Sequence, residues 1–210
     1  MQVKEDDDAI LNCFLGTGNI KEEVFDWKKD KDKNKKEVFL YAKGSYYGHG
    51  QTGQDSHFVG RVFHFPDQLQ FGNASIVIRK TKTSDSGTYT CHFPNHQPEI
   101  RSSISLTVGA SSQPIITLHK TNNGVLLKCV VRGASPKPVV EWWDSDGNIL
   151  PADQPKITER GGNKYDVILN ATVTKTGFYR CVSTQKEINH QIETETHVIV
   201  PGEFLLNIFY

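Results

Sequence analysis

Short runs of apolar and β-branched residues alternate with polar turn residues along the whole chain, and no long stretch has apolar residues at helical spacing. In the first half each run is bounded by Gly, Pro, Asn, Asp or Ser, as strands usually are. The runs that we expect to be strands cover residues 9–14, 24–28, 38–42, 75–79, 88–93 and 103–108. Residues 41–61 are rich in Gly, Ser and Gln, which leaves room for additional edge strands. The pattern predicts an all-β first half.

The same order of features returns in a shorter form in the second half. Residues 109–114, Gly-Ala-Ser-Ser-Gln-Pro, break the pattern, and we expect a linker there. Residues 127–131 then alternate towards a buried Cys129, and Trp142 follows thirteen residues after that Cys. We therefore predict two domains and a tail towards a stalk or membrane segment, at residues 1–110, 111–201 and 202–210.

One stretch, residues 82–91, has the residue order of a corner in a β-sandwich. An acidic turn and a Gly precede a Tyr, which stands two residues before a Cys. At such a corner the Gly makes the tight turn, the Tyr89 hydroxyl bonds back to the upstream backbone, and Cys91 faces the core. Residues 175–181, Lys-Thr-Gly-Phe-Tyr-Arg-Cys, repeat this order with Lys175 in place of the acidic residue, so we expect no buried ion pair there.

The composition excludes several classes of function. With 24 basic and 24 acidic side chains the formal charge is zero, so neither a nucleic acid nor a membrane surface is expected as the main partner. No stretch approaches the ~20 apolar residues that span a bilayer. The chain has no Gly-x-Ser-x-Gly, His-Glu-x-x-His, phosphate-loop or dinucleotide motif, so we expect no enzyme and no cofactor. Its four Cys allow three pairings, and spacing alone does not choose among them.

The first half resembles an immunoglobulin variable-type domain through three features: Cys13, Trp27 fourteen residues later, and the corner that ends at Cys91. The second half, with Trp142 thirteen residues after Cys129, resembles the shorter constant-type domain. We therefore predict an all-β protein of two tandem immunoglobulin-like β-sandwiches, variable-type and then constant-type.

The pair of domains resembles the two-domain ectodomains of the B-seven costimulatory-ligand and butyrophilin family. The residues that carry this resemblance are 85–91 in the first domain and, in the second, 133–138 (Gly-Ala-Ser-Pro-Lys-Pro) with Trp142. The resemblance covers roughly residues 9–200. It implies one disulfide and an aromatic core in each domain, formed by Cys13 with Cys91, Cys129 with Cys181, and the rings of Trp27, Tyr89, Trp142 and Tyr179.

The expected disulfides indicate a protein outside the reducing cytosol. No signal peptide is visible, because residues 1–4 run directly into Glu5 and three Asp, so we expect a trimmed piece of an extracellular, cell-surface (type I membrane) protein. The apolar residues 204–210 are too few to span a bilayer. They are either the approach to a stalk or membrane helix or an ordinary chain end, and any membrane contact would need a segment that this sequence lacks.

Two groups of charged residues have structural explanations. Variable-type domains often carry a basic residue where Arg61 stands, so the resemblance implies an ion pair between Arg61 and Asp85 that fixes a loop across the bottom of the sandwich. Six lysines lie within residues 28–36, diluted by Asp30 and Asp32. We expect a solvated hairpin loop there; the alternative is weak attachment to anionic glycans.

Two kinds of polar residue are candidates for binding or modification. His92, Asn95 and His96 lie at the loop after the Cys91 strand, and we expect them to contact a partner. No metal is expected, since a metal site needs a tight set of ligands and the cysteines are assigned to disulfides. Asn73 and Asn170 each begin an Asn-x-Ser/Thr triplet, and we expect at least one of them to be glycosylated.

The resemblance implies that the sheet carrying Trp27 and Cys91 is the recognition surface. Because side chains alternate between the two faces of a sheet, several residues of this one are expected to point outward. They are Asp26, Lys28, Thr90, His92, Arg101 and Ser103. Along residues 38–42 the alternation leaves two choices. We favour Phe39 and Tyr41 outward, because aromatic side chains are enriched at interface centres; the alternative is that both rings fill the core.

Our leading hypothesis is a cell-surface ligand that regulates T cells or other lymphocytes by presenting this sheet to an immunoglobulin-type receptor. The second domain would act as a spacer, and no chemistry would be involved. One alternative is an adhesion or virus-receptor-like molecule in which the same sheet pairs with its own copy as a weak homodimer. Another alternative is a soluble decoy or an antigen-receptor chain.

Overall fold

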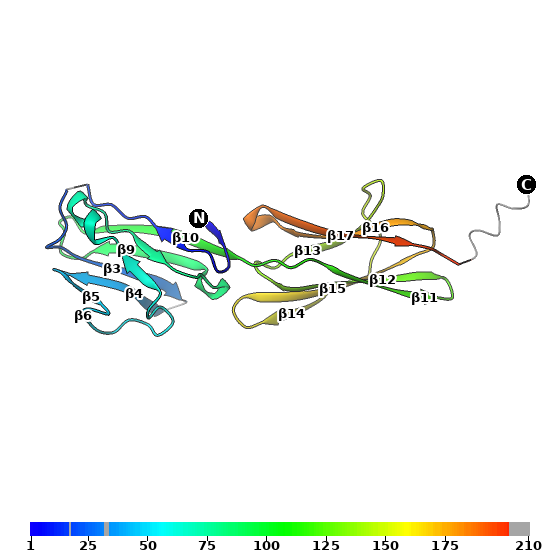
Figure 1. Ribbon diagram of the computed structural model, residues 1–210, viewed down its shortest axis with the longest axis horizontal. Helices are drawn as coiled ribbons and strands as arrows, with labels where there is room; N and C mark the ends of the chain where they lie inside the picture. Colours follow the sequence, from blue (N-terminus) through cyan, green and yellow to red (C-terminus); the bar gives the residue numbers. More distant parts are fainter. Residues whose placement is uncertain (17, 32–33, 202–210) are drawn as a thin grey trace, which may run out of the picture. The chain divides into compact units, whose positions relative to one another are not determined.

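The structure is a computed structural model that describes residues 1–16, 18–31 and 34–201. The chain forms two compact units, Met1–Val108 and a second that begins at Gly109 (Figure 1). Strands dominate the described residues, whose helices are the short 3₁₀ turns η1 (Pro66–Phe71), η2 (Thr83–Asp85) and η3 (Lys186–Ile188). No helix in these ranges is long and apolar enough to cross a membrane. The predicted tail at residues 202–210 and Lys33 of the lysine-rich segment lie outside the described residues.

The first unit is a sandwich of two sheets. The larger one, which we call the front sheet, has the strand order β1-β10-β9-β3-β4-β5-β6. Its strands are β1 (Gln2–Lys4), β3 (Val24–Lys31), β4 (Asn34–Ala42), β5 (Ser45–Tyr47), β6 (Gly50–Gln51), β9 (Gly87–Phe93) and β10 (Ile100–Gly109). The smaller one, the back sheet, has the order β2-β8-β7, formed by β2 (Ala9–Leu11), β7 (Val62–His64) and β8 (Ile76–Ile78). All six predicted runs contain a strand, and β5 and β6 are the additional edge strands expected within residues 41–61.

The core of the first unit forms around the disulfide between Cys13 and Cys91. Trp27 belongs to the same buried cluster, and its indole Nε1 donates a hydrogen bond to the Ala74 carbonyl at 2.9 Å. Because that polar group is satisfied, the whole ring can be buried at little cost. Residues next to Trp27 and Cys91 in the chain consequently face away from the core, and this positions the candidate site on the front sheet.

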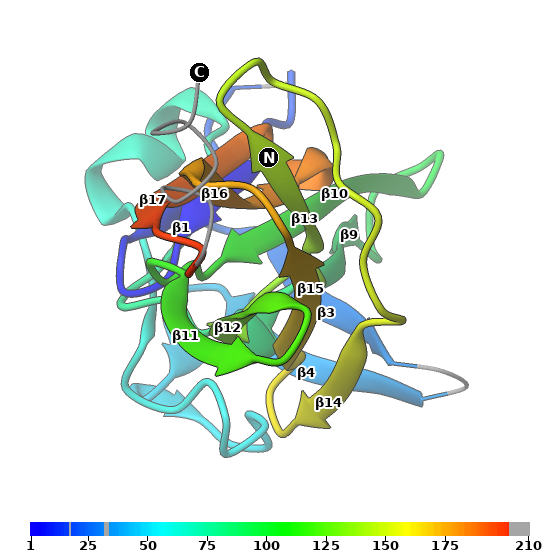
Figure 2. The same cartoon turned by 90° about the vertical axis from the view of Figure 1, so that its right-hand side faces the viewer.

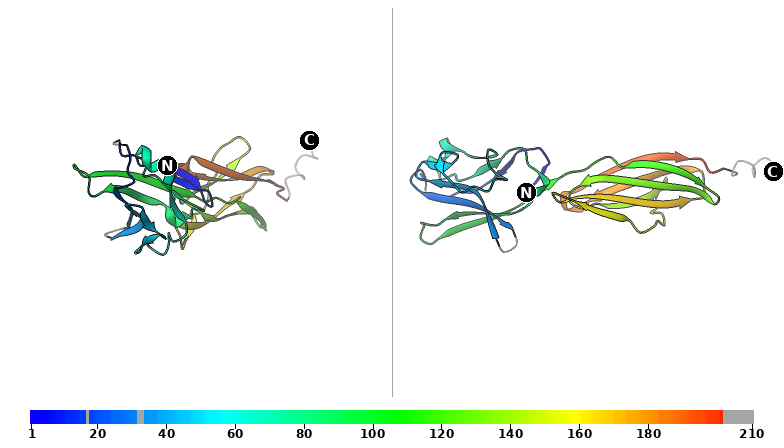
Figure 3. Two further views of the ribbon diagram at one scale, coloured as in Figure 1. Left: turned by 60° about the vertical axis from the view of Figure 1, so that its left-hand side comes forward. Right: turned by 90° about the horizontal axis from the view of Figure 1, so that it is seen from below.

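The second unit is also a two-layer sandwich, with the layers face to face (Figures 2 and 3). One sheet has the order β11-β12-β15-β14, formed by β11 (Ile115–Thr121), β12 (Gly124–Ala134), β14 (Lys156–Arg160) and β15 (Lys164–Val173). The other has the order β13-β16-β17, formed by β13 (Val139–Asp144), β16 (Gly177–Gln185) and β17 (His190–Val198). This four-plus-three arrangement is that of constant-type domains. The Cys129–Cys181 disulfide joins the two sheets, and the buried Trp142 donates from Nε1 to the Leu169 carbonyl at 3.2 Å.

The predicted corner is present in both units. The Tyr89 hydroxyl donates to the Asp85 carbonyl at 2.6 Å, and the Tyr179 hydroxyl donates to the Lys175 carbonyl at 2.8 Å. Each bond reaches back four residues and fixes the turn that precedes the Cys strand. The expectation that a Tyr would bond to the upstream backbone is therefore confirmed in both units.

The preference for Phe39 and Tyr41 as outward residues is wrong. Both rings belong to the core, with exposed fractions of 1% and 3%. Phe25 stacks on Tyr41 with ring centroids 5.0 Å apart, and the Tyr41 hydroxyl leaves the core edge to donate to the Lys21 carbonyl at 2.8 Å. The register also shifts between Trp27 and Lys28 through a bulge, so β4 does not follow one alternation along its length.

The lysine-rich segment extends β3 and β4 instead of forming a long loop, since β3 continues to Lys31 and β4 begins at Asn34. Its lysines largely form ion pairs with acidic side chains or hydrogen bonds with backbone carbonyls. Lys36 contacts Asp55 at 3.1 Å, and Lys29 is buried and donates to the Ser84 carbonyl at 2.7 Å. The lysine charges of this hairpin are therefore largely paired with groups of the first unit.

Candidate functional site

The outward side chains of four adjacent strands form two rows across the front sheet. In the first row Arg101 on β10 lies opposite His92 on β9, and His92 lies opposite Asp26 on β3. The second row runs through Ser103, Thr90, Lys28 and Glu37. The hydroxyl oxygens of Thr90 and Ser103 are 3.2 Å apart. The residues that the alternation predicted for this face, other than the two rings of β4, thus lie side by side.

A continuous set of ion pairs links these rows, and we call it the front-sheet ion network. Lys28 Nζ lies 3.2 Å from Asp26 Oδ2 and 3.1 Å from Glu37 Oε1. His92 Nδ1 lies 3.1 Å from Asp26 Oδ1, and its Nε2 contacts Glu99. Arg101 completes the set by donating to Glu99 from Nη2 at 2.7 Å and from Nε at 3.2 Å. The members are Lys28, Asp26, Glu37, His92, Glu99 and Arg101.

Contacts within the network shift the pKa of two of its members, Glu99 and Lys28. Hydrogen bonds from Arg101 and then His92 hold the pKa of Glu99 below its ordinary value. Burial alone would lower the pKa of Lys28, but its hydrogen bonds to Glu37 and Asp26 outweigh burial and raise that pKa. Burial, followed by the charge of Glu37, raises the pKa of the neighbouring Tyr47 to about 12. Both shifts favour the charged forms, so the face carries the negative charge of Glu99 and the positive charge of Lys28.

The network surrounds a hollow of about 210 Å³. The residues that line it are Asp26, Lys28, Lys35, Thr90, His92 and Arg101. Asp26 and Thr90 are each only 9% exposed, whereas Arg101 and Ser103 are exposed. The exposed Arg101 and Ser103 are therefore more accessible to a partner than Asp26 and Thr90.

The loop between β9 and β10 borders this face. Asn95 is exposed, and the half-buried His96 directs Nδ1 at the Pro98 carbonyl, 3.0 Å away. Sequence reasoning had not singled out Glu37 or Glu99, and it had placed Lys35 only in the lysine-rich segment. Glu37 could have been found only with the register of β4, which the bulge at Trp27 obscures. In the described ranges no group of three or more His, Cys, Asp or Glu is arranged to hold a metal ion.

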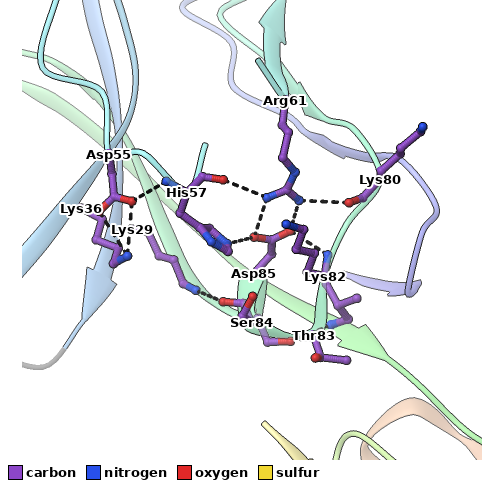
Figure 4. Close-up of polar contacts among 12 residues, drawn as sticks. Lys29, Lys36, Asp55, His57, Arg61, Lys80, Lys82, Thr83, Ser84 and Asp85 are labelled. Atoms are coloured by element: carbon purple, nitrogen blue, oxygen red, sulfur yellow. Dashed lines mark hydrogen bonds and ion pairs between the residues drawn. The ribbon is translucent and has the colours of Figure 1, made fainter. Parts of the chain in front are cut away.

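A second polar cluster surrounds Asp85 at the bottom of the first unit (Figure 4). Arg61 Nη2 forms the expected ion pair with Asp85 Oδ2, and Arg61 Nη1 donates to Asp85 Oδ1 at 3.3 Å. His57 Nε2 lies 2.6 Å from Oδ1, and the Lys82 backbone N–H donates to Oδ2 at 2.8 Å. Arg61 also donates to the backbone carbonyls of three residues: His57, Arg79 and Lys80. The cluster therefore joins a loop, η2 and the residues that follow β8.

The two predicted glycosylation sites lie in different settings. Asn73 follows η1, is half-buried, and pairs with Phe14 through an isolated antiparallel bridge. Asn170 lies in the middle of β15, between Leu169 and Ala171 of the core. Its Oδ1 is buried without a hydrogen-bond partner among the described residues.

The strand orders, the two disulfides between sheets and the tyrosine corners together define a tandem immunoglobulin-domain protein. The model of the immunoglobulin V-set domain matches residues 1–109, and the model of the immunoglobulin I-set domain matches residues 112–200. The chain therefore belongs to the immunoglobulin V-set family, with an I-set domain after the V-set domain.

Known relatives agree with this membership. Human HERV-H LTR-associating protein 2 is 31% identical over 65% of this chain and 31% of that protein. Human V-set domain-containing T-cell activation inhibitor 1 is 27% identical over 65% of this chain and 47% of that protein. The crystal structure of bovine butyrophilin matches with a TM-score of 0.81 at 22% identity and covers 94% of both chains. The resemblance to the B-seven and butyrophilin family is confirmed, and the matches span between 31% and 47% of these two curated relatives.

Proposed function

We propose that the protein is an extracellular, cell-surface ligand that regulates the activation of T cells or other lymphocytes by binding an immunoglobulin-type receptor. The front-sheet ion network would be the contact surface. The observation that carries the proposal is the alignment of ion-pairing side chains of both signs on four adjacent strands of one sheet. The name of the relative V-set domain-containing T-cell activation inhibitor 1 supports the immune-regulatory part.

The chemistry of this face suits reversible binding without a catalytic step. Charged groups across an interface mainly set specificity and association rate, and they contribute less to raw affinity. Arg101, whose side chain is 55% exposed, and the partly exposed Lys28 can each exchange a partner within the network for one on a receptor. Two disulfides suit an oxidising extracellular setting.

The experiment is a binding screen of residues 1–201 against immunoglobulin-type lymphocyte receptors, with variants that reverse one charge. We expect Lys28→Glu and Arg101→Glu each to weaken binding at least tenfold, which corresponds to about 1.4 kcal/mol. The matched control is Lys120→Glu, an exposed lysine on β11 of the second unit, which should leave the affinity unchanged. Equal affinity of all three variants with the unchanged protein would reject the front sheet as the contact surface.

A second candidate function, homophilic adhesion, is favoured by one feature of the same network. Because the face carries Arg101 and Lys28 beside Glu99 and Glu37, two copies related by a two-fold axis could match opposite charges. Sedimentation equilibrium at rising concentration distinguishes the candidates. A dimer that Arg101→Glu dissociates would favour adhesion, and a monomer that binds a receptor would favour the ligand.

A further inference from the structure

Two exposed phenylalanines flank Asn73. Phe71 and Phe14 are 66% and 63% exposed, the highest fractions among the large apolar side chains that the structure describes. Phe71 ends η1 two residues before Asn73, and Phe14 pairs with Asn73 across an antiparallel bridge. Aromatic rings left in water forgo the stabilisation that burial gives, so two exposed rings that flank one residue point to something attached there that covers them.

The local backbone holds the segments that carry Phe14 and Asn73 against each other. Gly72 is in the left-handed region at φ +78°, and a Cβ there would lie 2.2 Å from the Leu15 carbonyl oxygen. The Leu15 N–H donates to the Gly72 carbonyl at 2.9 Å, and the Ala74 N–H donates to the Cys13 carbonyl at 2.8 Å. The turn is therefore packed directly against the segment that carries Phe14.

Alternation places Phe14 and Asn73 on the outer face of the back sheet. Cys13 and Ala74 are buried, so their neighbours Phe14 and Asn73 face away from the core. Residues directly opposite each other on antiparallel strands project to the same side and are close enough to interact. A group attached to Asn73 would therefore lie beside the Phe14 ring.

The Asn73 amide is oriented for attachment of a sugar. Its Oδ1 accepts a hydrogen bond from the Ser75 N–H at 2.9 Å, which directs Nδ2 away from that turn. No described residue forms a hydrogen bond with Nδ2, the atom that carries an N-linked glycan. Asn73-Ala74-Ser75 is an acceptor triplet, and Ser75 is buried where its Oγ accepts from the Cys13 N–H at 3.0 Å.

We propose that Asn73 carries an N-linked glycan whose first N-acetylglucosamine packs on the rings of Phe71 and Phe14 and stabilises the first unit. The apolar face of a sugar ring, lined with C–H groups, is suited to contact with an aromatic face. The proposal shares with the proposed function only the secretory route of the chain. Loss of receptor binding would leave it unaffected, and an unoccupied Asn73 would leave the proposed function unaffected.

The first experiment measures occupancy. The chain is secreted from mammalian cells, treated with a peptide:N-glycanase in heavy-oxygen water, and analysed by peptide mass spectrometry for labelled Asp at position 73. We expect Asn73 to be occupied in most molecules and to lose its glycan in Ser75→Ala but not in Ser75→Thr. An Asn73 that remains unlabelled would overturn the proposal.

The second experiment tests the ring contact. Thermal unfolding is compared between protein trimmed to a single N-acetylglucosamine and protein from which the glycan has been removed completely, in three backgrounds. We expect removal to lower the midpoint by about 4 °C in the unchanged protein and in Phe71→Tyr. In the double variant Phe14→Ala, Phe71→Ala, removal of the glycan should lower the midpoint by less than half of that amount. Equal losses in all three backgrounds would overturn the ring contact.

Asn170 provides the matched control for these measurements. It also begins an acceptor triplet, but its neighbours on the outer face of β15 and β12 are Thr172 and Lys128. Asn170→Gln is used throughout, so that a glycan there does not contribute. In a companion variant that keeps Asn170 and carries Asn73→Gln, an equal fall in midpoint on glycan removal would count against the proposal.

Discussion

Asp85 has no exposed surface, yet it keeps its charge because donors surround both of its oxygens. Burial alone would raise the pKa of this carboxyl. Hydrogen bonds from Arg61, the Lys82 backbone and His57 outweigh burial and hold the pKa below its ordinary value. A buried carboxylate of this kind is stable only while its partners remain, so the cluster is sensitive to loss of any one of them.

Removal of Arg61 should destabilise the first unit strongly. Arg61→Ala leaves the Asp85 carboxylate buried without its main partner, and we expect the free energy of unfolding at neutral pH to fall by about 3 kcal/mol. Urea denaturation measures this change. The control is Arg101→Ala on the exposed front face, which should leave stability unchanged. A loss in Arg61→Ala no larger than in the control would contradict the account of this corner.

Acid should reduce the difference in the free energy of unfolding between the unchanged protein and Arg61→Ala. In the unchanged protein the pKa of Asp85 is lower in the folded than in the unfolded state, so its stabilisation is complete above about pH 4 and is lost as pH falls through the folded pKa. In Arg61→Ala the carboxyl lacks the hydrogen bond that most lowers its pKa. We therefore expect the difference in stability to shrink below about pH 4; a constant difference would contradict this assignment.

The sequence predicted part of this cluster. Arg61 and Asp85 stand at positions where variable-type domains carry such a pair, and their contact is confirmed. His57 was not predicted, because it lies in the segment between β6 and β7 that has no alternation to fix its direction. Its contact with Asp85 forms only when that segment folds across the end of the sandwich.

At the scale of elements, the same turn and strand occur once in each unit, which allows a paired test. Tyr89→Phe and Tyr179→Phe each remove one hydroxyl that donates to a backbone carbonyl. We expect each to lower the free energy of unfolding of its own unit by about 1 kcal/mol. The control is Tyr165→Phe on β15, whose hydroxyl has no hydrogen-bond partner in the described part of the chain. Losses equal to that of the control would show that the corner bonds contribute nothing.

The strands were predictable from the sequence, but which side chains of β4 point into the core was not. Runs such as residues 88–93 and 103–108 alternate regularly, so their inward and outward sides follow directly. In β4 both Val38 and Phe39 are buried, because the bulge beside Trp27 changes the register. The large rings then fill the core under the edge strands β5 and β6, where Phe39 contacts Tyr46. A single sequence gave no sign of that bulge.

At the scale of the whole molecule, the two units have separate cores and separate disulfides. Each unit buries its own apolar cluster. The net charge of zero hides a local concentration of charge, since the front-sheet ion network gathers six charged or titratable side chains on one face. Composition alone could not predict this face, because the strands that form it are far apart in the sequence.

The measurement that tests the central proposal most directly is amide hydrogen exchange of residues 1–201 with and without the receptor found in the screen. We predict slower exchange on binding in β3, β9 and β10, around Asp26, His92 and Arg101, and unchanged exchange in the second unit. Slower exchange confined to the back-sheet strands β2, β7 and β8, or to the second unit, would contradict the front sheet as the receptor-binding surface.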